Sequence, residues 1–580
     1  MPGEGRSERV KLAIDKLITT DGTEIHLPSR GVSVVVGGNN VGKSTLLNEI
    51  AAQLDRVGGS NPTNFHIVQE ISISQEGSID DVRAWMDEHA AKTFESGGAI
   101  YRGIAGGGVS ESTMGHFWTN NQYPGSIGTL FSLLVHKGDA HNRLGWVQPQ
   151  EQRRDISMPA TNPIQKLSDD VNLLQEVCTL YYRVFRESLT LDRLGGHLQF
   201  RVGTTSVPAP LITEITKEYR DSLAALPSLH DQGDGMKSFM GLLLPIVTAQ
   251  YQIIIIDEPE AFLHPPQANI LGKILGDLAH ARDVQVILAT HDRNLLIGLL
   301  ESQAEVSVVR LDRRSSGTRV HQLKPAAIKE LWSDPVLRYT NILDGLFHRI
   351  VVLAEGDRDC RYYKAVLDHV DATTALGFPP GDVLFVPAGG KDGFVRLVGA
   401  LNSVSVPVVV VPDIDLLNEK SKVQRLLGAL GGTWTPELDR DYRVSTEPFR
   451  RPRAQVTCGR ILEQVRLVLE SRSDRIYDKE TSDHVKAALR SEASPWQELK
   501  TYGVAAFKGE AAVAADRMLD TLEECGIVLV RAGELERLAP LVQSHKGPAW
   551  LEEALSSRFY ENELSQEQVR RIMASAQRYL

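Results

Sequence analysis

The chain has 580 residues, of which 42% are hydrophobic and 24% are charged. This balance is typical of a soluble globular protein, and at about 100–200 residues per domain the length predicts about three to five domains. The formal net charge of −11 excludes a chain that binds duplex DNA through an overall basic surface, so a DNA contact would need a local basic patch. The apolar stretches fall far short of the ~20 residues that span a bilayer, and no secretory signal is visible, which predicts a cytoplasmic protein without membrane contact.

The first motif is a phosphate-binding loop between a predicted buried strand, Gly31–Val36, and a predicted helix, Thr45–Leu54. From residue 37 the loop reads Gly-Gly-Asn-Asn-Val-Gly-Lys-Ser, which matches G-x-x-x-x-G-K-[ST] in the context that this motif requires. Its backbone N–H groups would wrap the phosphates, Lys43 would reach the β- and γ-phosphates, and Ser44 would bind Mg²⁺. The predicted nucleotide-binding residues of the loop are Gly37, Asn39, Asn40, Gly42, Lys43, Ser44 and Thr45.

Two further predicted strands end in residues suited to ATP hydrolysis. Ile253–Ile256 is a run of four isoleucines, which indicates a strand buried on both faces, as in a parallel sheet. Asp257 follows it and is placed to hold Mg²⁺, while Glu258 is placed to orient or deprotonate the attacking water. The strand Val284–Ala289 is followed by His291, which would sense or polarise the γ-phosphate.

A pair of glycines, Gly233 and Gly235, opens a predicted apolar helix, Phe239–Ala249, just before the run of isoleucines. Glycines at the start of a helix form an anion-binding site. Because the phosphate-binding loop already serves the chain's own nucleotide, this second site is expected to cover the γ-phosphate held by another subunit. Gly233 and Gly235 are therefore predicted to bind nucleotide across a dimer.

The interval between the phosphate-binding loop and Asp257 is too long for a compact ATPase domain, which indicates an insertion over about residues 76–226. An amphipathic helix is predicted near Ile164–Glu187. A coiled-coil arm would need hundreds of residues of sustained heptads, which this insertion lacks. We therefore predict a small helical region for dimerisation or for binding a partner.

This order of motifs resembles that of ABC-type ATPases, and the two asparagines of the loop, Asn39 and Asn40, resemble the SMC-like branch of that family. The resemblance implies a dimer that holds ATP between its subunits. One departure is that Asp234 stands where the family's signature usually has a serine. Gln69 is a candidate for the family's Q-loop glutamine, with Gln75 as the alternative.

The second half carries three predicted strands that each end in acidic or glycine residues. Glu355 follows the first strand, Gly389-Gly390-Lys391 follows the second, and Asp413 and Asp415 follow the third. Open α/β sheets gather their ligands at the carboxyl ends of strands, so these side chains are expected to converge although they lie far apart in the sequence.

The pattern of strand-Glu-Gly, strand-Gly-Gly-Lys and strand-Asp-x-Asp resembles a Toprim domain. Placed behind an ABC-type ATPase, it resembles the overcoming-lysogenization-defect (OLD) family of ATP-dependent endonucleases, which includes the nuclease subunit of the Gabija anti-phage system. The resemblance implies an α/β fold with an ABC-type P-loop ATPase domain and its helical insertion over residues 1–345. A Toprim α/β domain with a helical insertion and C-terminal helices would follow over residues 346–580.

The resemblance also implies a two-metal site for Mg²⁺ or Mn²⁺, which prefer oxygen ligands. Glu355 and Asp359 would serve one ion, and Asp413 and Asp415 the other. Family members supply a later acidic residue and a lysine that stabilises the transition state. For the acid, Glu536 is preferred and Glu534 is the alternative. For the lysine, Lys546 is preferred and Lys508 is the alternative. Asp357 is a weaker candidate ligand.

The function predicted on these grounds is that of an ATP-binding, metal-dependent DNA endonuclease in anti-phage defence, with DNA and a second copy of the chain as partners. The family often works beside a helicase or another defence protein. The alternative is an ATP-driven sensor or scaffold whose Toprim site is inactive and which acts through a partner protein. A primase would need a zinc module and a topoisomerase a tyrosine domain, and neither is visible in the sequence.

Overall fold

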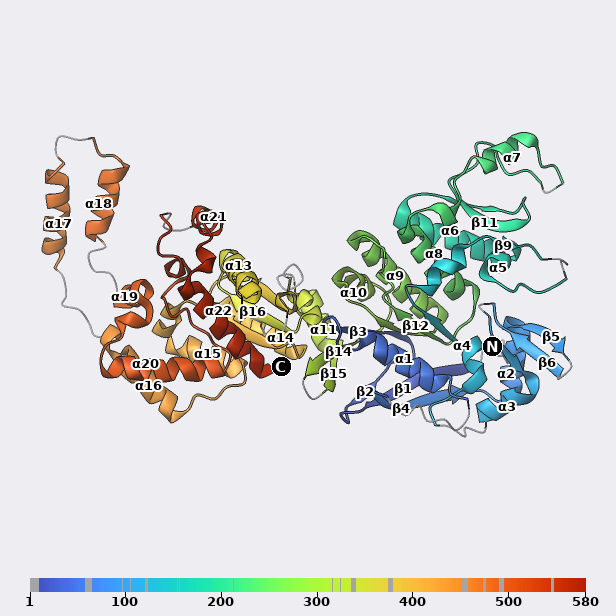
Figure 1. Cartoon of the computed structure of the whole chain (residues 1–580), viewed down its shortest axis with the longest axis horizontal. Coiled ribbons are helices and arrows are strands. Elements are labelled where there is room, and N and C mark those ends of the chain that lie inside the picture. Colours follow the sequence, from blue (N-terminus) through green and yellow to red (C-terminus); the bar gives the residue numbers. More distant parts are fainter. Residues whose placement is uncertain are drawn as a thin grey trace. The chain divides into compact units, whose positions relative to one another are not determined.

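The protein is described from a computed structural model in which the chain divides into two units, Met1–Tyr339 and Thr340–Leu580. Each unit has its own parallel sheet and its own core (Figure 1). The structure describes residues 10–57, 65–95, 98–104, 106–119, 124–153, 155, 157–211, 213–314, 317–323, 325–334, 341–373, 379–450, 457–472, 476–489, 495–543 and 547–579.

The first unit is built on a six-stranded sheet with the order β15-β14-β3-β13-β12-β8. All neighbouring strands are parallel except β14 and β15, which form an antiparallel hairpin. Nearly all residues of the central strands β3, β12 and β13 are buried, as expected for strands of a parallel sheet that is covered on both faces. The strands are β3 (Gly31–Gly37), β8 (Val135–Gly138), β12 (Ile253–Asp257), β13 (Gln285–Ala289), β14 (Val306–Arg314) and β15 (Gly317–Leu323).

A smaller antiparallel sheet of order β2-β1-β4 shares a hydrophobic core with this sheet. Helix α1 packs against β4 as well as against β3, β12 and β13, and so ties the two sheets together. Helices α9 and α10 pack on each other (Figure 1). These elements are β1 (Lys11–Thr19), β2 (Glu24–His26), β4 (Val68–Glu76), α1 (Lys43–Leu54), α8 (Asp234–Thr248), α9 (Pro265–Arg282), α10 (Arg293–Leu300) and α11 (Pro325–Ser333).

The insertion expected to be helical contains strands as well as helices. Two three-stranded antiparallel sheets, β5-β6-β7 and β10-β11-β9, lie within it, and its strand β8 joins the main sheet beside β12. Strands of two or three residues, such as β9 and β7, are too short to show alternation in a sequence. The elements are α2 (Ile79–His89), β5 (Ala91–Glu95), β6 (Gly98–Arg102), β7 (Gly108–Ser110), α3 (Glu111–Thr119), α4 (Phe131–Leu134), β9 (Gln150–Glu151), α5 (Pro163–Asp169), α6 (Val171–Phe185), β10 (Leu189–Asp192), β11 (His197–Val202) and α7 (Lys217–Ala224).

The single helix predicted near Ile164–Glu187 is two helices, α5 and α6, which are separated at Asp170. The backbone of Asp170 is extended, and its carboxylate accepts hydrogen bonds from the N–H groups of Asn172 at 2.9 Å and Leu173 at 3.1 Å. A side chain that satisfies the free N–H groups of a helix start begins a new helix at that position. The prediction was therefore wrong about one continuous helix.

The second unit contains a parallel sheet of order β17-β16-β18. The segment after Gly526 extends it, because Ile527 and Val530 form parallel bridges to Val410 and Asp413 beside β18. The residues of β16 and β18 are fully buried, as expected for central strands covered on both faces. The elements are β16 (Ile350–Ala354), α13 (Asp357–Thr373), β17 (Val383–Pro387), α14 (Gly393–Ser403), β18 (Val408–Val411) and α15 (Lys420–Ala429).

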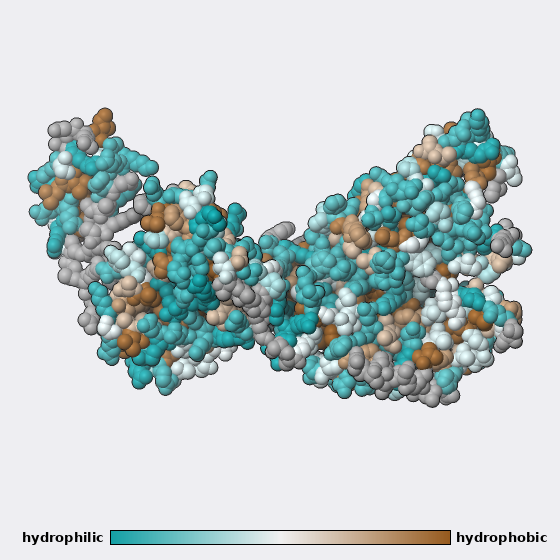
Figure 2. Space-filling view, viewed as in Figure 1, coloured by the Kyte–Doolittle hydropathy of each residue, from teal (hydrophilic) through white to brown (hydrophobic). Residues whose placement is uncertain are grey.

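Helices make up most of the rest of this unit (Figure 1). Helices α17 and α18 lie side by side as a hairpin. Figure 2 shows hydrophobic surface on this hairpin. Leu462 of α17 is one of its exposed hydrophobic residues. Among the helices that the structure describes, none combines the length and the apolar character needed to cross a bilayer. The helices are α16 (Pro436–Arg450), α17 (Cys458–Glu470), α18 (Lys479–Leu489), α19 (Pro495–Tyr502), α20 (Glu510–Glu524), α21 (Pro548–Ser556) and α22 (Glu563–Ala576).

Candidate functional site

In the first unit, the phosphate-binding loop and the two predicted hydrolysis motifs follow three adjacent parallel strands, β3, β13 and β12. The Lys43 ammonium, which is buried, donates to the backbone oxygens of Gly37 at 3.0 Å and Gly38 at 2.8 Å. Gly37 and Gly42 have φ angles of 148° and 103°, values that L-residues with a side chain rarely adopt. Burial lowers the pKa of Lys43, and the nearby carboxylates oppose that shift. The loop thus places a cation at the carboxyl edge of the sheet.

The remaining predicted residues of the loop lie at its open side. Asn39, Asn40 and Ser44 are exposed and Thr45 is half-buried, so these polar groups face solvent rather than the core. The Asn40 carbonyl accepts a hydrogen bond from Arg313 Nη1 of β14 at 3.0 Å. The neighbouring strand therefore helps to hold the loop in place.

Asp257 at the end of β12 hydrogen bonds with the Ser44 side chain. Burial raises the pKa of Asp257, with the charge of Glu258 acting in the same direction. Its Oδ1 atom is buried and has no hydrogen-bond partner among the described residues. A buried carboxylate oxygen beside a serine hydroxyl suits a divalent cation, which prefers oxygen ligands. The two predicted Mg²⁺-binding residues of the ATPase half are thus adjacent, and the donor set fits the ion.

Glu258 and His291 lie together beyond the same strand ends. His291 Nδ1 is 3.5 Å from the Glu258 carboxylate and 3.4 Å from that of Glu260. Glu260 is buried and accepts hydrogen bonds from Thr290 Oγ1 at 2.7 Å and from the His291 N–H at 3.1 Å. Burial raises the pKa of Glu260. Glu260 thus fixes the backbone that carries His291, while Glu258 stays partly exposed toward the loop.

The predicted signature glycines lie at the start of α8. Gly233 is the N-cap of this helix, and Asp234 pairs with Lys237 one turn later at 2.7 Å. A Cβ atom on Gly235 would lie 2.7 Å from the carbonyl oxygen of Phe262, so a larger residue does not fit there. The two glutamine candidates, Gln69 and Gln75, both lie in β4.

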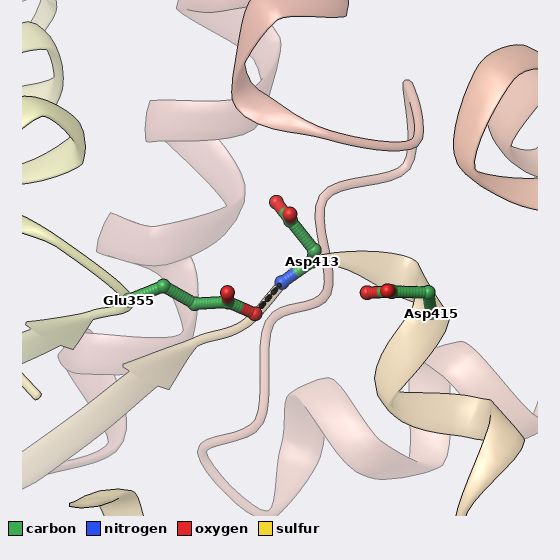
Figure 3. A group of neighbouring side chains, drawn as sticks. All are labelled: Glu355, Asp413 and Asp415. Carbon is green, nitrogen blue, oxygen red and sulfur yellow. Dashed lines mark hydrogen bonds between the residues drawn. The ribbon is translucent and has the colours of Figure 1, made fainter. Parts of the chain in front are cut away.

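In the second unit, three predicted metal ligands meet at the carboxyl edge of the sheet. Glu355 follows β16, and Asp413 and Asp415 follow β18 (Figure 3). Carboxylate oxygens of the three residues all lie within 4.8 Å of one another. The Asp413 N–H donates to Glu355 Oε1 at 3.1 Å, which fixes the position of the Glu355 side chain.

Beside this triad is a cavity of about 280 Å³. It brings Asp359, in the first turn of α13, to the same side of the sheet as Glu355 and Asp413. Glu534 and Glu536, which follow the segment beside β18, also line it, so the structure gathers both alternatives for the later acidic ligand. Asp357, by contrast, points to solvent and pairs with Arg361 at 2.8 Å.

Crowding and burial perturb the acids of this cavity. Burial raises the pKa of Asp413 to about 8, and the neighbouring Glu355 charge adds to the shift. Burial also raises the pKa of Asp359 to about 6. Burial raises the pKa of Glu355 as well, against the opposing charge of Lys391. Carboxylates held this close favour protons or cations between them, which is the donor chemistry of a Mg²⁺ or Mn²⁺ site.

Lysines supply positive charge to the same cluster. Lys500 Nζ of α19 lies 3.5 Å from Asp413 Oδ2, 3.5 Å from Asp415 Oδ2 and 3.7 Å from Glu534 Oε2. Lys391 forms an ion pair with the other oxygen of Asp415. Of the two lysines expected from the sequence, Lys508 is exposed in the turn before α20, and Lys546 lies outside the described residues.

Sequence reasoning missed Lys500 because α19 lies far along the chain from the strands and carries no motif. One signal was present: Gly533 has a φ of 119°, and a Cβ atom there would lie 2.2 Å from the Lys500 carbonyl oxygen. A glycine directly before Glu534 thus marks the place where α19 packs against the acidic turn. Arg143, a buried residue of the insertion that contacts the turn after β12, was missed as well.

Comparison with known proteins finds similarity over parts of this chain. The family described as "AAA domain, putative AbiEii toxin, Type IV TA system" matches residues 145–298. The chain is 25% identical over 172 residues to "Old nuclease" of Escherichia phage P2, which covers 29% of this chain and 28% of that protein. It is 26% identical over 221 residues to "OLD nuclease" of Thermus scotoductus, which covers 36% of this chain and 40% of that protein. With "Protein ea59" of Escherichia phage lambda it shares 21% identity over 381 residues, covering 59% and 65%.

The chain spans less than two thirds of the length of each of these relatives. Among solved structures, an Smc head bound to the C-winged helix domain of ScpA matches 54% of this chain and 98% of its own, at 12% identity and a TM-score of 0.31. The cbiO1 structure from Clostridium perfringens, part of an ABC transporter complex, matches 58% of this chain and 96% of its own, at 14% identity and a TM-score of 0.28. The two curated nucleases and the AAA-domain match confirm the resemblance of this chain to the OLD family of ATPase-nucleases, which the order of its motifs predicts.

Proposed function

We propose that the chain is an ATP-binding, divalent-metal-dependent DNA endonuclease in which an ABC-type ATPase dimer controls cleavage at a Toprim-type site. The observation that carries this proposal is the acidic cavity at the edge of the second sheet, which gathers Glu355, Asp359, Asp413 and Glu536. Asp415 completes the triad beside it. DNA as the substrate, and a role in anti-phage defence, rest on the family resemblance.

The ligand assignment follows from the arrangement of these carboxylates. Glu355 and Asp359 would hold one divalent ion, Asp413 and Asp415 would hold or share the second, and Glu536 or Glu534 would complete the set. Such ions, when bound, activate water and stabilise the leaving oxygen in phosphodiester hydrolysis. The chain's own part is to keep the acids in place, through the Asp413 N–H bonded to Glu355 and through Lys500 among Asp413, Asp415 and Glu534.

In the ATPase half, Lys43 would bind the β- and γ-phosphates, and Ser44 with Asp257 would hold Mg²⁺. Glu258 would orient or deprotonate the attacking water, with His291 at 3.5 Å from its carboxylate as the γ-phosphate sensor. The glycines at the start of α8 would cover the nucleotide of a second subunit, which makes a homodimer the smallest active form. A helicase or another defence protein is a candidate partner on the ground of the family resemblance.

The test is cleavage of supercoiled plasmid by the purified full chain in Mg²⁺ or Mn²⁺, with and without ATP. An Asp413→Asn/Asp415→Asn variant removes two ligand charges with little change in side-chain volume. The matched control is Asp357→Asn, because Asp357 lies in the same region but its side chain is 63% exposed and paired with Arg361. We expect metal-dependent nicking by wild type and the control, none by the double variant, and unchanged ATP hydrolysis in all three.

A second reading, an ATP-driven sensor or scaffold without nuclease activity, is favoured by one observation. Asp234 replaces the usual signature serine and already pairs with Lys237, which leaves that turn less free to bind a phosphate. Under this reading the wild type hydrolyses or binds ATP, but it cuts neither plasmid nor linear DNA under any nucleotide condition. The plasmid assay therefore separates the two functions directly.

A further inference from the structure

Arg143 lies almost wholly inside the first unit, with 2% of its surface exposed. It belongs to a short 3₁₀ helix, Asn142–Val147, in the insertion, far in sequence from the ATPase motifs. Its guanidinium nonetheless donates to the carbonyl oxygens of Glu258 and Pro259, with Nη1 3.0 Å from the latter. A planar fork that binds two consecutive carbonyls fixes the backbone between them more firmly than a single donor can.

The turn that Arg143 holds is strained. Glu258 has a φ of 47°, in the left-handed region, where a residue with a side chain pays a conformational penalty. Its N–H donates to the Ala289 carbonyl of β13 at 3.0 Å. The N–H of Glu258 is thus held by the neighbouring strand, and its carbonyl by Arg143. Such strain persists only where the surroundings over-determine the conformation.

The same arginine is locked to the helix that begins with the signature glycines. Its 3₁₀ helix packs against α8, and a Cβ atom on Gly241 of α8 would lie only 1.8 Å from the Arg143 carbonyl oxygen. The absence of a side chain at Gly241 lets the two backbones touch. Arg143 therefore touches α8 through its backbone and the carbonyls of Glu258 and Pro259 through its guanidinium.

The burial of the Arg143 guanidinium also affects its pKa. Removal from water lowers the pKa of Arg143, and the charges of Glu260, Asp139, Glu258 and Asp257 oppose that shift. A buried cation surrounded by acids is retained at a high desolvation penalty. An apolar side chain would make a purely structural contact between the insertion and the sheet at a lower desolvation cost. The buried arginine therefore points to a role in the placement of the acids.

We propose that Arg143 is a positioning residue for ATP hydrolysis: it holds the Glu258 carboxylate in its hydrolytic position and couples that position to the signature helix α8. The proposal rests on the proposed ATPase function, with Glu258 as the residue that acts on water. It assigns the inserted region a direct part in the hydrolysis step. Arg143 itself reaches the backbone of Glu258 and Pro259, so it acts through Glu258.

The test compares Arg143→Met and Arg143→Lys with wild type by steady-state ATP hydrolysis and by equilibrium binding of a fluorescent ATP analogue. Because a misplacement of about 1 Å can lower a rate about 100-fold, we expect kcat of Arg143→Met to fall by about that factor while nucleotide affinity changes less than about threefold. Lysine can reach one carbonyl but lacks the planar fork, so the kcat of Arg143→Lys should lie between that of wild type and that of Arg143→Met. If Arg143→Met does not fold, the Lys variant alone carries the comparison.

A matched control separates positioning from general support. Arg282, at the C-terminal end of α9, also donates to two consecutive carbonyls, those of Ile246 and Val247, both at 2.9 Å, and pairs with Glu176 at 3.1 Å. Both carbonyls belong to the last turn of α8, at the end of that helix opposite the signature glycines. Arg282→Met should lower thermal stability and leave kcat per folded molecule unchanged.

A double variant with Glu258→Gln decides the matter. If Arg143 acts through the Glu258 carboxylate, Arg143→Met should lower the rate no further once that carboxylate is gone. An additional loss in the double variant, or a parallel loss of nucleotide affinity and kcat in Arg143→Met, would overturn the proposal. If Glu258→Gln hydrolyses ATP as fast as wild type, the proposed role of Glu258 fails and the proposal for Arg143 fails with it. The proposal is supported if Glu258→Gln lowers the rate and Arg143→Met lowers kcat only when Glu258 is present.

Discussion

Replacement of Lys500 by methionine should destabilise the metal-free protein. The Lys500 ammonium lies 3.5 Å from Asp413 Oδ2, 3.5 Å from Asp415 Oδ2 and 3.7 Å from Glu534 Oε2. Without it, these three carboxylates lose the cation that they share, although Lys391 still pairs with Asp415 and Arg537 with Glu534 at 3.9 Å. Methionine preserves the length and apolar part of the side chain, so the variant mainly removes the charge.

The expected size of the effect follows from the burial of the site. Removal of one member of a buried ion pair costs about 3–5 kcal/mol, and since 23% of the Lys500 side chain is exposed we take the lower end, about 3 kcal/mol. For a unit of this size each kcal/mol shifts Tm by about 2–4 °C, so Tm should fall by about 6–12 °C in EDTA. Calorimetry of the full chain, which should resolve the transition of the second unit, measures this shift.

Divalent metal should reverse the loss. A cation that binds only the folded state raises its stability by about 2.7 kcal/mol when its concentration is a hundred times Kd. Mn²⁺ should therefore raise Tm more in Lys500→Met than in wild type, where the ammonium competes for the same oxygens. Lys508→Met, a change at an exposed lysine, is the matched control and should leave both values unchanged. A Tm in EDTA equal to or above that of wild type would refute the electrostatic role of Lys500.

Three further predictions follow from other contacts. Between its ordinary pKa of 3.8 and its raised value of about 8, folded Asp413 retains a proton that the unfolded chain releases, so the free energy of unfolding in EDTA should fall as the pH rises through that window. Urea unfolding at pH 6 and pH 8 measures this, and Asp413→Asn should flatten the dependence. Gly241→Ala places a Cβ atom 1.8 Å from a carbonyl oxygen and should destabilise the first unit by about 1–3 kcal/mol in thermal unfolding. Lys43→Ala removes the buried loop cation and should lower ATP affinity by at least about tenfold in equilibrium binding, without change to metal binding at the second site; equal ATP affinity would contradict the assignment of the loop.

Much of the fold was accessible from the sequence because the strands of a parallel sheet are distinctive. Runs such as Ile253–Ile256 are buried on both faces, and the acidic or glycine residue after each run marks its carboxyl end. Since parallel strands present these ends at one edge, the meeting of Glu355 with Asp413 and Asp415 could be expected without knowledge of the strand order.

The remaining features depend on tertiary contacts that leave a weak trace in the sequence. Lys500 reaches the acids because α19 packs against the turn at Gly533, and neither segment carries a motif. The insertion was predicted as helical because its one clear sequence pattern is that of an amphipathic helix. Its strand β9 has only two residues and is defined by its pairing with β11, so it leaves no pattern in the sequence. Arg143 binds backbone carbonyls, which impose no residue type on their own positions and so give no sequence signal.

The order of the two units along the chain also sets an order of assembly during synthesis. The last carboxylates of the acidic cavity, Glu534 and Glu536, lie about 200 residues after Tyr339, where the first unit ends. A ribosome that adds about 5–20 residues per second needs about 10–40 s to cover that distance, and domains generally fold N-terminal first. The nascent chain therefore has time to fold its nucleotide-binding unit before the acidic cavity is complete, so the part proposed to control cleavage is made before the part proposed to cut.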